Sequence, residues 1–282
     1  MTLSLIIFLL SVISFPRFSV SSSTSEFLYS GCTQQRYTPN SAYESNLDSL
    51  LTSLVNSATY SSYNNFTIVG STPQDVVYGL YQCRGDLAMP DCATCVARAV
   101  TRAGDLCRET CGGAVQLDGC FVKYDNATFL GVEDKTVVLK QCGPSVGYNP
   151  DAMGSRDAVL AGLAGSGGNF RVGGSGGVRG VAQCSGDLSS GECEDCVSEA
   201  ISRLKSDCGT ADYGDMFLGK CYARYSTGGA HHESKAHGKA HHMLFHKEGQ
   251  KTFAIIIGSL AGVAILIIFL AFLSKICGRQ GK

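Results

Sequence analysis

The chain has 282 residues, which is long enough for one or two domains, and its formal net charge is −1. A net charge so close to zero provides no electrostatic argument for a nucleic-acid partner. Cysteine usage is the unusual feature, because fourteen cysteines far exceed ordinary composition and favour a disulfide-rich protein from an oxidising compartment.

An apolar segment opens the chain. The letters MTLSLIIFLLSVISF have the length of a signal peptide and are followed by small residues, although no positive charge precedes them. We interpret residues 1–24 as a secretory signal peptide rather than a membrane anchor, because the run is short and Pro16 and Arg17 end it. The segment that follows is therefore expected to be extracellular.

Two kinds of periodicity predict the elements that follow. Apolar residues recur on one helical face in residues 45–58 and again in residues 91–107. Runs of β-branched and aromatic residues predict strands, at 66–71, 75–83, 114–117, 120–125, 136–142, 169–173, 177–184, 215–221 and 222–225. We expect an α+β fold of two tandem disulfide-rich domains, each an antiparallel sheet with two helices on one face. The glycine-rich residues 162–180 are expected to form a flexible hairpin tip.

A duplication organises the cysteines. The spacing C-x8-C-x2-C-x11-C-x12-C starts at Cys83 and again at Cys184, a constant offset of 101 residues. Such self-similarity identifies a tandem repeat, and we predict domains at 25–132 and 133–228. The residues that recur beside the cysteines are Gly79, Gln82, Gly85, Asp86, Leu87 and Tyr124, matched by Gly180, Gln183, Gly186, Asp187, Leu188 and Tyr225. Gly85 and Asp86 are expected to serve a turn.

The cysteines allow three readings. Zinc would require a second C-x-x-C pair or histidines in each domain, and neither domain contains a histidine. A redox pair would place its C-x-x-C at a helix start after a parallel strand, whereas here the motif is embedded in a larger cysteine array. We therefore predict three disulfides per domain, with the connectivity open. Cys111 has no counterpart in the second repeat, and we interpret it as a buried free thiol rather than an intermolecular link.

No catalytic constellation is present in the sequence of the two domains. Without a histidine there, Ser-His and Cys-His nucleophile pairs are excluded, and no two carboxylates stand out. We predict that the protein is not an enzyme and has no cofactor and no metal site. All six histidines lie between residues 231 and 246. We interpret residues 229–252 as a solvated stalk, with pH or metal sensing as the alternative.

An uncharged apolar run of residues 253–273 follows the stalk. Its length is that of a helix crossing a hydrocarbon core. Lys275, Arg279 and Lys282 come next, which assigns residues 274–282 to the cytoplasm. We predict a single-pass type I membrane protein with a very short tail.

Several positions are candidates for modification or helix pairing. Gly258 and Gly262 form a G-x-x-x-G motif that would allow two membrane helices to approach closely and form a homo- or heterodimer. Cys277 lies beside the predicted span and is a candidate for S-palmitoylation, with an unmodified thiol as the alternative. Asn65 and Asn126 are N-glycosylation acceptors.

The repeated cysteine array, the strands LDGCFVKYDN and MFLGKCYARY, and the order of the segments resemble the plasmodesmata-located proteins of land plants. Each domain is similar to the ginkbilobin-type cysteine-rich domain. The resemblance implies a disulfide connectivity that leaves Cys111 unpaired. The implied pairs are Cys32–Cys107, Cys83–Cys92, Cys95–Cys120, Cys142–Cys208, Cys184–Cys193 and Cys196–Cys221.

The resemblance also implies a function. We expect a protein of the plasma membrane at plasmodesmata that restricts cell-to-cell movement by promoting callose deposition, and some members of the family dock viral movement proteins. Its expected partner is a cell-wall glycan or an extracellular protein.

Two alternatives remain. The first is a membrane-tethered glycan-binding defence protein. The antifungal relatives bind mannose through an Asn, an Arg and a Glu, and the matching positions are Thr33, Ala114 and Asp125, of which only Asp125 keeps the chemistry. In the second repeat, Gly143 and Ser226 also depart from the pattern. The second alternative is a redox-responsive module that uses Cys111.

Overall fold

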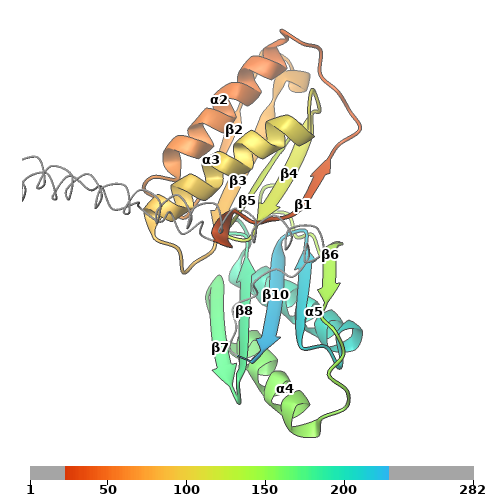
Figure 1. Cartoon of the computed structure of the whole chain (residues 1–282). Coiled ribbons are helices and arrows are strands. Elements are labelled where there is room, and N and C mark those ends of the chain that lie inside the picture. Colours follow the sequence, from red (N-terminus) through yellow and green to blue (C-terminus); the bar gives the residue numbers. More distant parts are fainter. Residues whose placement is uncertain (1–22, 229–282) are drawn as a thin grey trace, which may run out of the picture. The chain divides into compact units, whose positions relative to one another are not determined.

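The computed structural model describes residues 23–228, which contain two domains of the same construction (Figure 1). Most of the predicted signal peptide, together with the stalk, the apolar run, Gly258, Gly262 and Cys277, lies outside the described residues. Among the residues that the structure describes, no helix has the length and apolar character needed to span a membrane.

Domain 1 is a five-stranded antiparallel sheet covered by helices. Its elements are η1 (Ser23–Ser25), β1 (Phe27–Cys32), α2 (Ala42–Ser57), β2 (Tyr63–Ile68), η2 (Pro73–Asp75), β3 (Val77–Cys83), α3 (Met89–Leu106), β4 (Gly112–Leu117) and β5 (Cys120–Asp125). The strands lie in the order β1-β4-β5-β3-β2. Helix α2 packs on β2 and β3, and α3 packs on β4 and β5.

Domain 2 repeats this arrangement. Its elements are β6 (Val137–Cys142), α4 (Pro150–Gly165), β7 (Phe170–Ser175), β8 (Val178–Cys184), α5 (Ser190–Asp207), β9 (Tyr213–Leu218) and β10 (Cys221–Thr227). The strand order β6-β9-β10-β8-β7 matches that of domain 1 position by position. The predicted α+β fold of two similar antiparallel domains is therefore confirmed.

Each core forms between the sheet and its helices. In α2, Leu47, Leu50 and Leu54 are spaced three or four residues apart, so they share one helical face, and all three are buried. A Cβ atom on Gly79 of β3 would clash with Leu50, and one on Gly180 of β8 would lie 2.8 Å from Cγ1 of Val159. The two glycines recur because the helices pack directly on the strand backbone.

Two recurring tyrosines anchor the helix ends. The hydroxyl of Tyr124 donates a hydrogen bond to the Cys107 carbonyl oxygen at 3.4 Å, and that of Tyr225 donates to the Cys208 carbonyl oxygen at 2.8 Å. Both carbonyl groups lie just past the last turn of α3 or α5, where no intrahelical donor remains. The repeated tyrosines therefore satisfy equivalent buried acceptors in the two domains.

Six disulfides tie these elements together, and they are the pairs that the family resemblance implies. Those of domain 1 are Cys32–Cys107, Cys83–Cys92 and Cys95–Cys120, and those of domain 2 are Cys142–Cys208, Cys184–Cys193 and Cys196–Cys221. In each domain two of the three bridges join a helix to a strand of the sheet that it covers. Cys111 is free and buried.

The glycine-rich segment differs from the prediction. Helix α4 continues to Gly165, and the residues from Phe170 onward form the paired strands β7 and β8. Only a tight turn at Gly176 and Gly177, both with positive φ, corresponds to the expected tip. The prediction was wrong in extent because strand pairing uses backbone groups, which glycine supplies as well as any other residue.

The two equivalent helices α5 and α3 begin differently. At α5, the Ser189 hydroxyl accepts from the Glu192 backbone N–H, and the Glu192 carboxylate accepts from the Ser189 backbone N–H, whereas Ala88 at the start of α3 has no side-chain cap. We predict that Ser189→Ala lowers the free energy of unfolding by about 1 kcal/mol. The neighbouring Ser190→Ala, measured in the same urea titration, should change it by less than about 0.5 kcal/mol. Equal effects would show that the cap contributes nothing.

Candidate functional site

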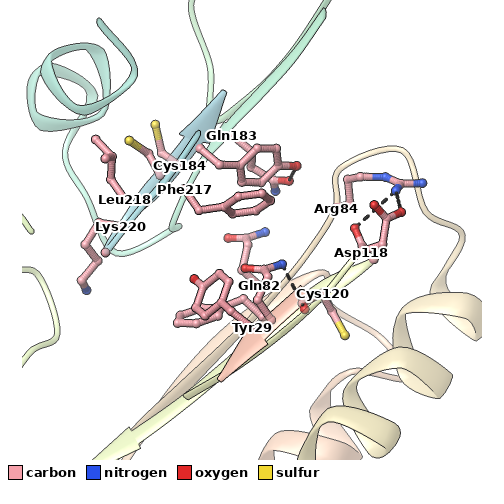
Figure 2. A pocket seen from close by; sticks show the side chains of 16 residues that line it. Tyr29, Gln82, Arg84, Asp118, Cys120, Gln183, Cys184, Phe217, Leu218 and Lys220 are labelled. Carbon is pink, nitrogen blue, oxygen red and sulfur yellow. Dashed lines mark hydrogen bonds and ion pairs between the residues drawn. The ribbon is translucent and has the colours of Figure 1, made fainter. Parts of the chain in front are cut away.

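The two domains belong to one compact unit, and we call the surface where they meet the seam. A cavity of about 40 Å³ lies in it, lined by side chains from both domains (Figure 2). That volume holds a few water molecules and is too small for a sugar ring. The residues that line this cavity include Tyr29, Gln82, Asp118, Gln183, Phe217 and Tyr222.

Hydrogen bonds cross the seam in both directions. The Gln183 side chain of domain 2 donates to the Cys83 carbonyl oxygen of domain 1 at 2.9 Å. Its counterpart in domain 1, Gln82, accepts from the Gly186 backbone N–H of domain 2 at 3.0 Å. Each recurring glutamine therefore bonds the backbone at or just after the end of the other domain's β3 or β8, Gln183 as a donor and Gln82 as an acceptor.

Aromatic rings cross the seam in the same reciprocal way. The ring of Tyr63, on β2, packs against Gly186 so closely that a Cβ atom there would lie 2.7 Å from the ring. The ring of Phe170, at the equivalent place on β7, packs equally closely against Gly85. Contacts in which equivalent residues exchange partners define an isologous interface. Here the two halves of one chain form it.

One half of the seam carries an ionic network that the other half lacks. Asp118 accepts from Arg84 of its own domain at 2.5 Å and from Arg224 of domain 2 at 2.6 Å. Arg224 also bonds Asp215 at 2.8 Å. Burial alone would raise the pKa of Asp118, but the charges and hydrogen bonds of the two arginines outweigh it and hold that pKa below 3.8. The counterpart of Asp118 in domain 2 is Gly219, so the network exists once.

The segment between the domains is held by a buried ion pair. Lys220 and Asp187 pair with each other, and their side chains are 2% and 4% exposed. Lys220 Nζ also donates to the Phe129 carbonyl oxygen at 2.9 Å, and Asp187 accepts from the Gly131 N–H at 2.9 Å. Burial lowers the pKa of Lys220, and the contacts of Lys220 hold the pKa of Asp187 below its ordinary value against burial. Both charges stay compensated, so the pair fixes the connection in place.

Two of the three positions that the family resemblance matched to mannose-binding residues, Thr33 and Asp125, converge on Gly112. A Cβ atom there would lie 2.6 Å from the Thr33 methyl group and 2.8 Å from an Asp125 carboxylate oxygen. The Thr33 hydroxyl donates to the Gly112 carbonyl oxygen at 3.3 Å, and Asp125 accepts from the Ala127 N–H at 3.0 Å. Ala114 adds only a methyl group. A hydroxyl and a carboxylate are therefore brought together, without the amide and the cation of the antifungal relatives.

Cys111 is 4% exposed. Burial, followed by the nearby Asp125 carboxylate, raises the pKa of its thiol. The reactive form of cysteine is the thiolate, so neither its burial nor its pKa favours redox chemistry or a link to another chain. The Tyr43 hydroxyl donates to the Cys111 backbone oxygen at 2.5 Å, which places this segment over α2.

The glycosylation acceptors differ in exposure. Asn65 is exposed on the edge strand β2, where its side-chain amide donates to the Tyr63 hydroxyl at 2.8 Å. Asn126 is half-buried, directly after β5. Within residues 23–228, no group of three His, Cys, Asp or Glu side chains is placed to hold a metal ion.

Sequence reasoning missed the seam. Gly85 and Asp86 do form the expected turn after β3, but Gly85 is also the place where Phe170 packs. The recurrence of Gln82 and Gly85 as Gln183 and Gly186 was the available signal. It did not identify an interface, because recurring residues can serve each domain separately or the contact between the two.

Two antiparallel sheets with paired helices, three disulfides each and a reciprocal seam define a tandem cysteine-rich ectodomain. The family described as salt stress response/antifungal matches residues 31–127 and 153–228. Two solved structures are similar, both of tandem DUF26 ectodomains from Arabidopsis thaliana cysteine-rich receptor-like proteins. That of PDLP5 has a TM-score of 0.69 at 48% identity and covers 72% of this chain and 100% of its own. That of PDLP8 has a TM-score of 0.70 at 39% identity, covering 73% and 100%.

Relatives extend the similarity to almost the whole chain. Plasmodesmata-located protein 7 of Arabidopsis thaliana is 62% identical over 280 residues, which is 99% of this chain and 93% of that protein. Plasmodesmata-located protein 6 of the same plant is 57% identical over 268 residues, 93% of each. The chain belongs to the plasmodesmata-located protein family, and the resemblance seen in its sequence is confirmed.

The glycines of the seam can be tested against a glycine in open space. We predict that Gly186→Ala lowers the free energy of unfolding by about 1–3 kcal/mol, because the added methyl group displaces the Tyr63 ring. Gly191→Ala, in α5 with no atom near its added methyl group, should raise it by up to about 1 kcal/mol. Chemical denaturation of the two variants measures the difference. A neutral Gly186→Ala would mean that the rings do not pack as described.

The ionic network predicts a pH dependence. Because the pKa of Asp118 is lower in the folded protein than its ordinary 3.8, its contribution is fully present above that value and is lost as the pH falls through the folded pKa. We predict that Asp118→Asn lowers stability by about 1.5–3 kcal/mol at pH 7 and that the deficit shrinks on acidification. Chemical denaturation of the Asp118→Asn variant and the unsubstituted protein at a series of pH values measures this difference in stability. Asp105→Asn, at an exposed carboxylate, is the control and should give no such convergence.

Proposed function

We propose that this protein acts at plasmodesmata, as a non-enzymatic membrane-anchored ectodomain that regulates cell-to-cell traffic. The observation that carries the proposal is the 62% identity to plasmodesmata-located protein 7 across 99% of the chain. Proteins 5 and 8 of the same series are 44% and 38% identical. An apolar run of residues 253–273 followed by basic residues supports a single-pass type I arrangement in the plasma membrane.

The proposed mechanism is recognition rather than catalysis. The ectodomain binds a cell-wall glycan or an extracellular protein, and the membrane segment, paired through Gly258 and Gly262, gathers other components that promote callose deposition. The resemblance of the ectodomain to receptor-like proteins supports a binding role, and so does the burial of Cys111, the free thiol of the described residues. Docking of viral movement proteins is a further activity of the same membrane-anchored form.

A membrane-tethered glycan-binding defence protein is the second candidate. It is favoured by the antifungal description of the family and by a 31% identity over 209 residues to an antimicrobial ginkbilobin-2-like protein of Castanea crenata. Thr33 and Asp125 converge as a sugar site would require, but Ala114 contributes no polar group to offset the desolvation of a sugar hydroxyl. This candidate therefore ranks second.

Imaging tests the location directly. The full chain with a fluorescent protein at its C-terminus, expressed in leaf epidermis, is expected to give paired puncta across the wall that coincide with a callose stain. The matched control, fused directly after Gly228, lacks the apolar run and is expected to give diffuse wall fluorescence. A smooth outline of the cell for the full chain would contradict the proposal and move the glycan-binding candidate ahead.

We also propose that Asn65 and Asn126 carry N-glycans. The exposed position of Asn65 on an edge strand makes it accessible to the modifying enzyme. Asn65→Gln and Asn126→Gln should each remove one step of the mobility shift that glycosidase treatment produces on a gel. Asn64→Gln, which destroys no acceptor sequence, is the control and should leave the shift unchanged.

A further inference from the structure

The outer faces of α3 and α5 differ in charge at some equivalent positions, although Arg102 of α3 corresponds to Arg203 of α5. At the repeat offset of 101 residues, Arg98 of α3 corresponds to Glu199 of α5, and the uncharged Thr94 corresponds to Asp195. The buried faces of the two helices are similar, because both cysteines, a valine and one alanine of each helix match, although Ala103 corresponds to Leu204. Packing therefore does not account for the difference in charge.

The α3 face includes an open groove with two arginines. Its volume is about 370 Å³, and its lining includes Ser25, Arg98, Thr101, Arg102 and the apolar Leu117. Arg98 donates to the Ser25 hydroxyl at 2.6 Å, and both residues line the groove. Arg102 follows one helical turn later and is exposed, and within residues 23–228 it forms no ion pair or hydrogen bond.

One carboxylate also lines this groove. Asp105 lies three residues after Arg102 on the same helix, so it is the next neighbour of that arginine on the helix surface. Its charge opposes an anionic ligand at that end. The acceptor for an anion is therefore the Arg98–Arg102 pair, whose side chains are about 5–6 Å apart at Cβ.

The α5 face presents the matching anions. Glu194 and Asp195 are adjacent and exposed in the first turns of the helix, and neither forms an ion pair or hydrogen bond within the described part of the chain. Glu199, by contrast, is bonded by Arg203 at 2.6 Å. Glu194 and Asp195 lie about one turn before Glu199, the counterpart of Arg98, and the charge of Lys135 also acts on Asp195.

We propose that the α3 groove of one copy of this chain receives the Glu194–Asp195 turn of α5 from a second copy. Guanidinium and carboxylate groups pair through two parallel hydrogen bonds, and the two arginines of the groove offer donors to an exposed carboxylate of this turn. Both halves of the contact belong to this chain, so a partner of other chemistry is not needed. The contact is independent of the proposed location at plasmodesmata.

The energetics set the conditions under which the association is seen. Exposed ion pairs contribute little and are screened by salt. The association is therefore weak in dilute solution, grows at low ionic strength, and gains from any tether that raises the local concentration of the chains. An ectodomain that is monomeric at ordinary salt agrees with this expectation.

The test uses the ectodomain, residues 23–228. This segment contains both cores and all six disulfides, and relatives' ectodomains have been crystallised as such. Sedimentation velocity measures self-association at about 0.02 M NaCl, where surface charges are weakly screened, and at about 0.5 M NaCl, where they are strongly screened. We expect association at low salt and its loss at high salt.

Charge reversal identifies the surfaces. Arg98→Glu with Arg102→Glu, and separately Glu194→Arg with Asp195→Arg, should each weaken the association at low salt by at least about tenfold. An equimolar mixture of the two double variants should restore it, because the acidic α3 of one then faces the basic α5 of the other. Arg36→Glu with Arg108→Glu changes the net charge of domain 1 equally at exposed sites outside the groove and should leave the association unchanged.

Four outcomes would overturn the proposal. The first is that the chain stays monomeric at low salt, and the second is that the charge reversals in the groove do not weaken its self-association. The third is that the Arg36 and Arg108 control weakens self-association as much as the groove variants do. The fourth is that mixing the two double variants does not restore association. Binding of an oligogalacturonide to the Arg98–Arg102 pair of a chain that does not self-associate would instead assign the groove to an acidic glycan. Circular dichroism confirms folding of every variant, and the Arg36 and Arg108 variant also reports on non-specific charge effects.

Discussion

The disulfide that joins β3 or β8 to the helix that follows it is the constraint on which this architecture depends. In domain 1, Cys83 at the end of β3 is bonded to Cys92 in the first turn of α3, so the loop between them is held at both ends. That loop carries the two features that the other domain uses, the Cys83 carbonyl group and the bare backbone of Gly85. Domain 2 repeats the arrangement, and the seam follows from two equally constrained loops.

Reciprocity and asymmetry have different roles in the seam. The exchanged rings of Tyr63 and Phe170 are the self-complementary part, which any two domains of this kind could share. The network around Asp118 and the pair of Lys220 with Asp187 exist on one side only. The ion pair between Asp118 and Arg224 favours the pairing of domain 1 with domain 2 over that of two copies of domain 1, because Arg224 belongs to domain 2.

Divergence outside the seam follows the same logic. The exposed faces of α3 and α5 are free of packing constraints and differ in charge, as at Arg98 and Glu199, while their buried faces keep matching cysteines. The scaffold is retained and its surfaces are specialised.

The duplication, the fold class and the family could be predicted from the sequence by itself. Cysteine spacing reflects the disulfide framework, and apolar periodicity reflects local secondary structure, so both can be seen along the chain without the tertiary fold. Helix faces such as that of Leu47, Leu50 and Leu54 could be predicted for the same reason. Only the tertiary structure decided that Gly85 receives a ring from residue 170 and that Asp118 pairs with Arg224. Such contacts join residues about a hundred positions apart, and their formation depends on how two finished surfaces fit, which no local pattern encodes.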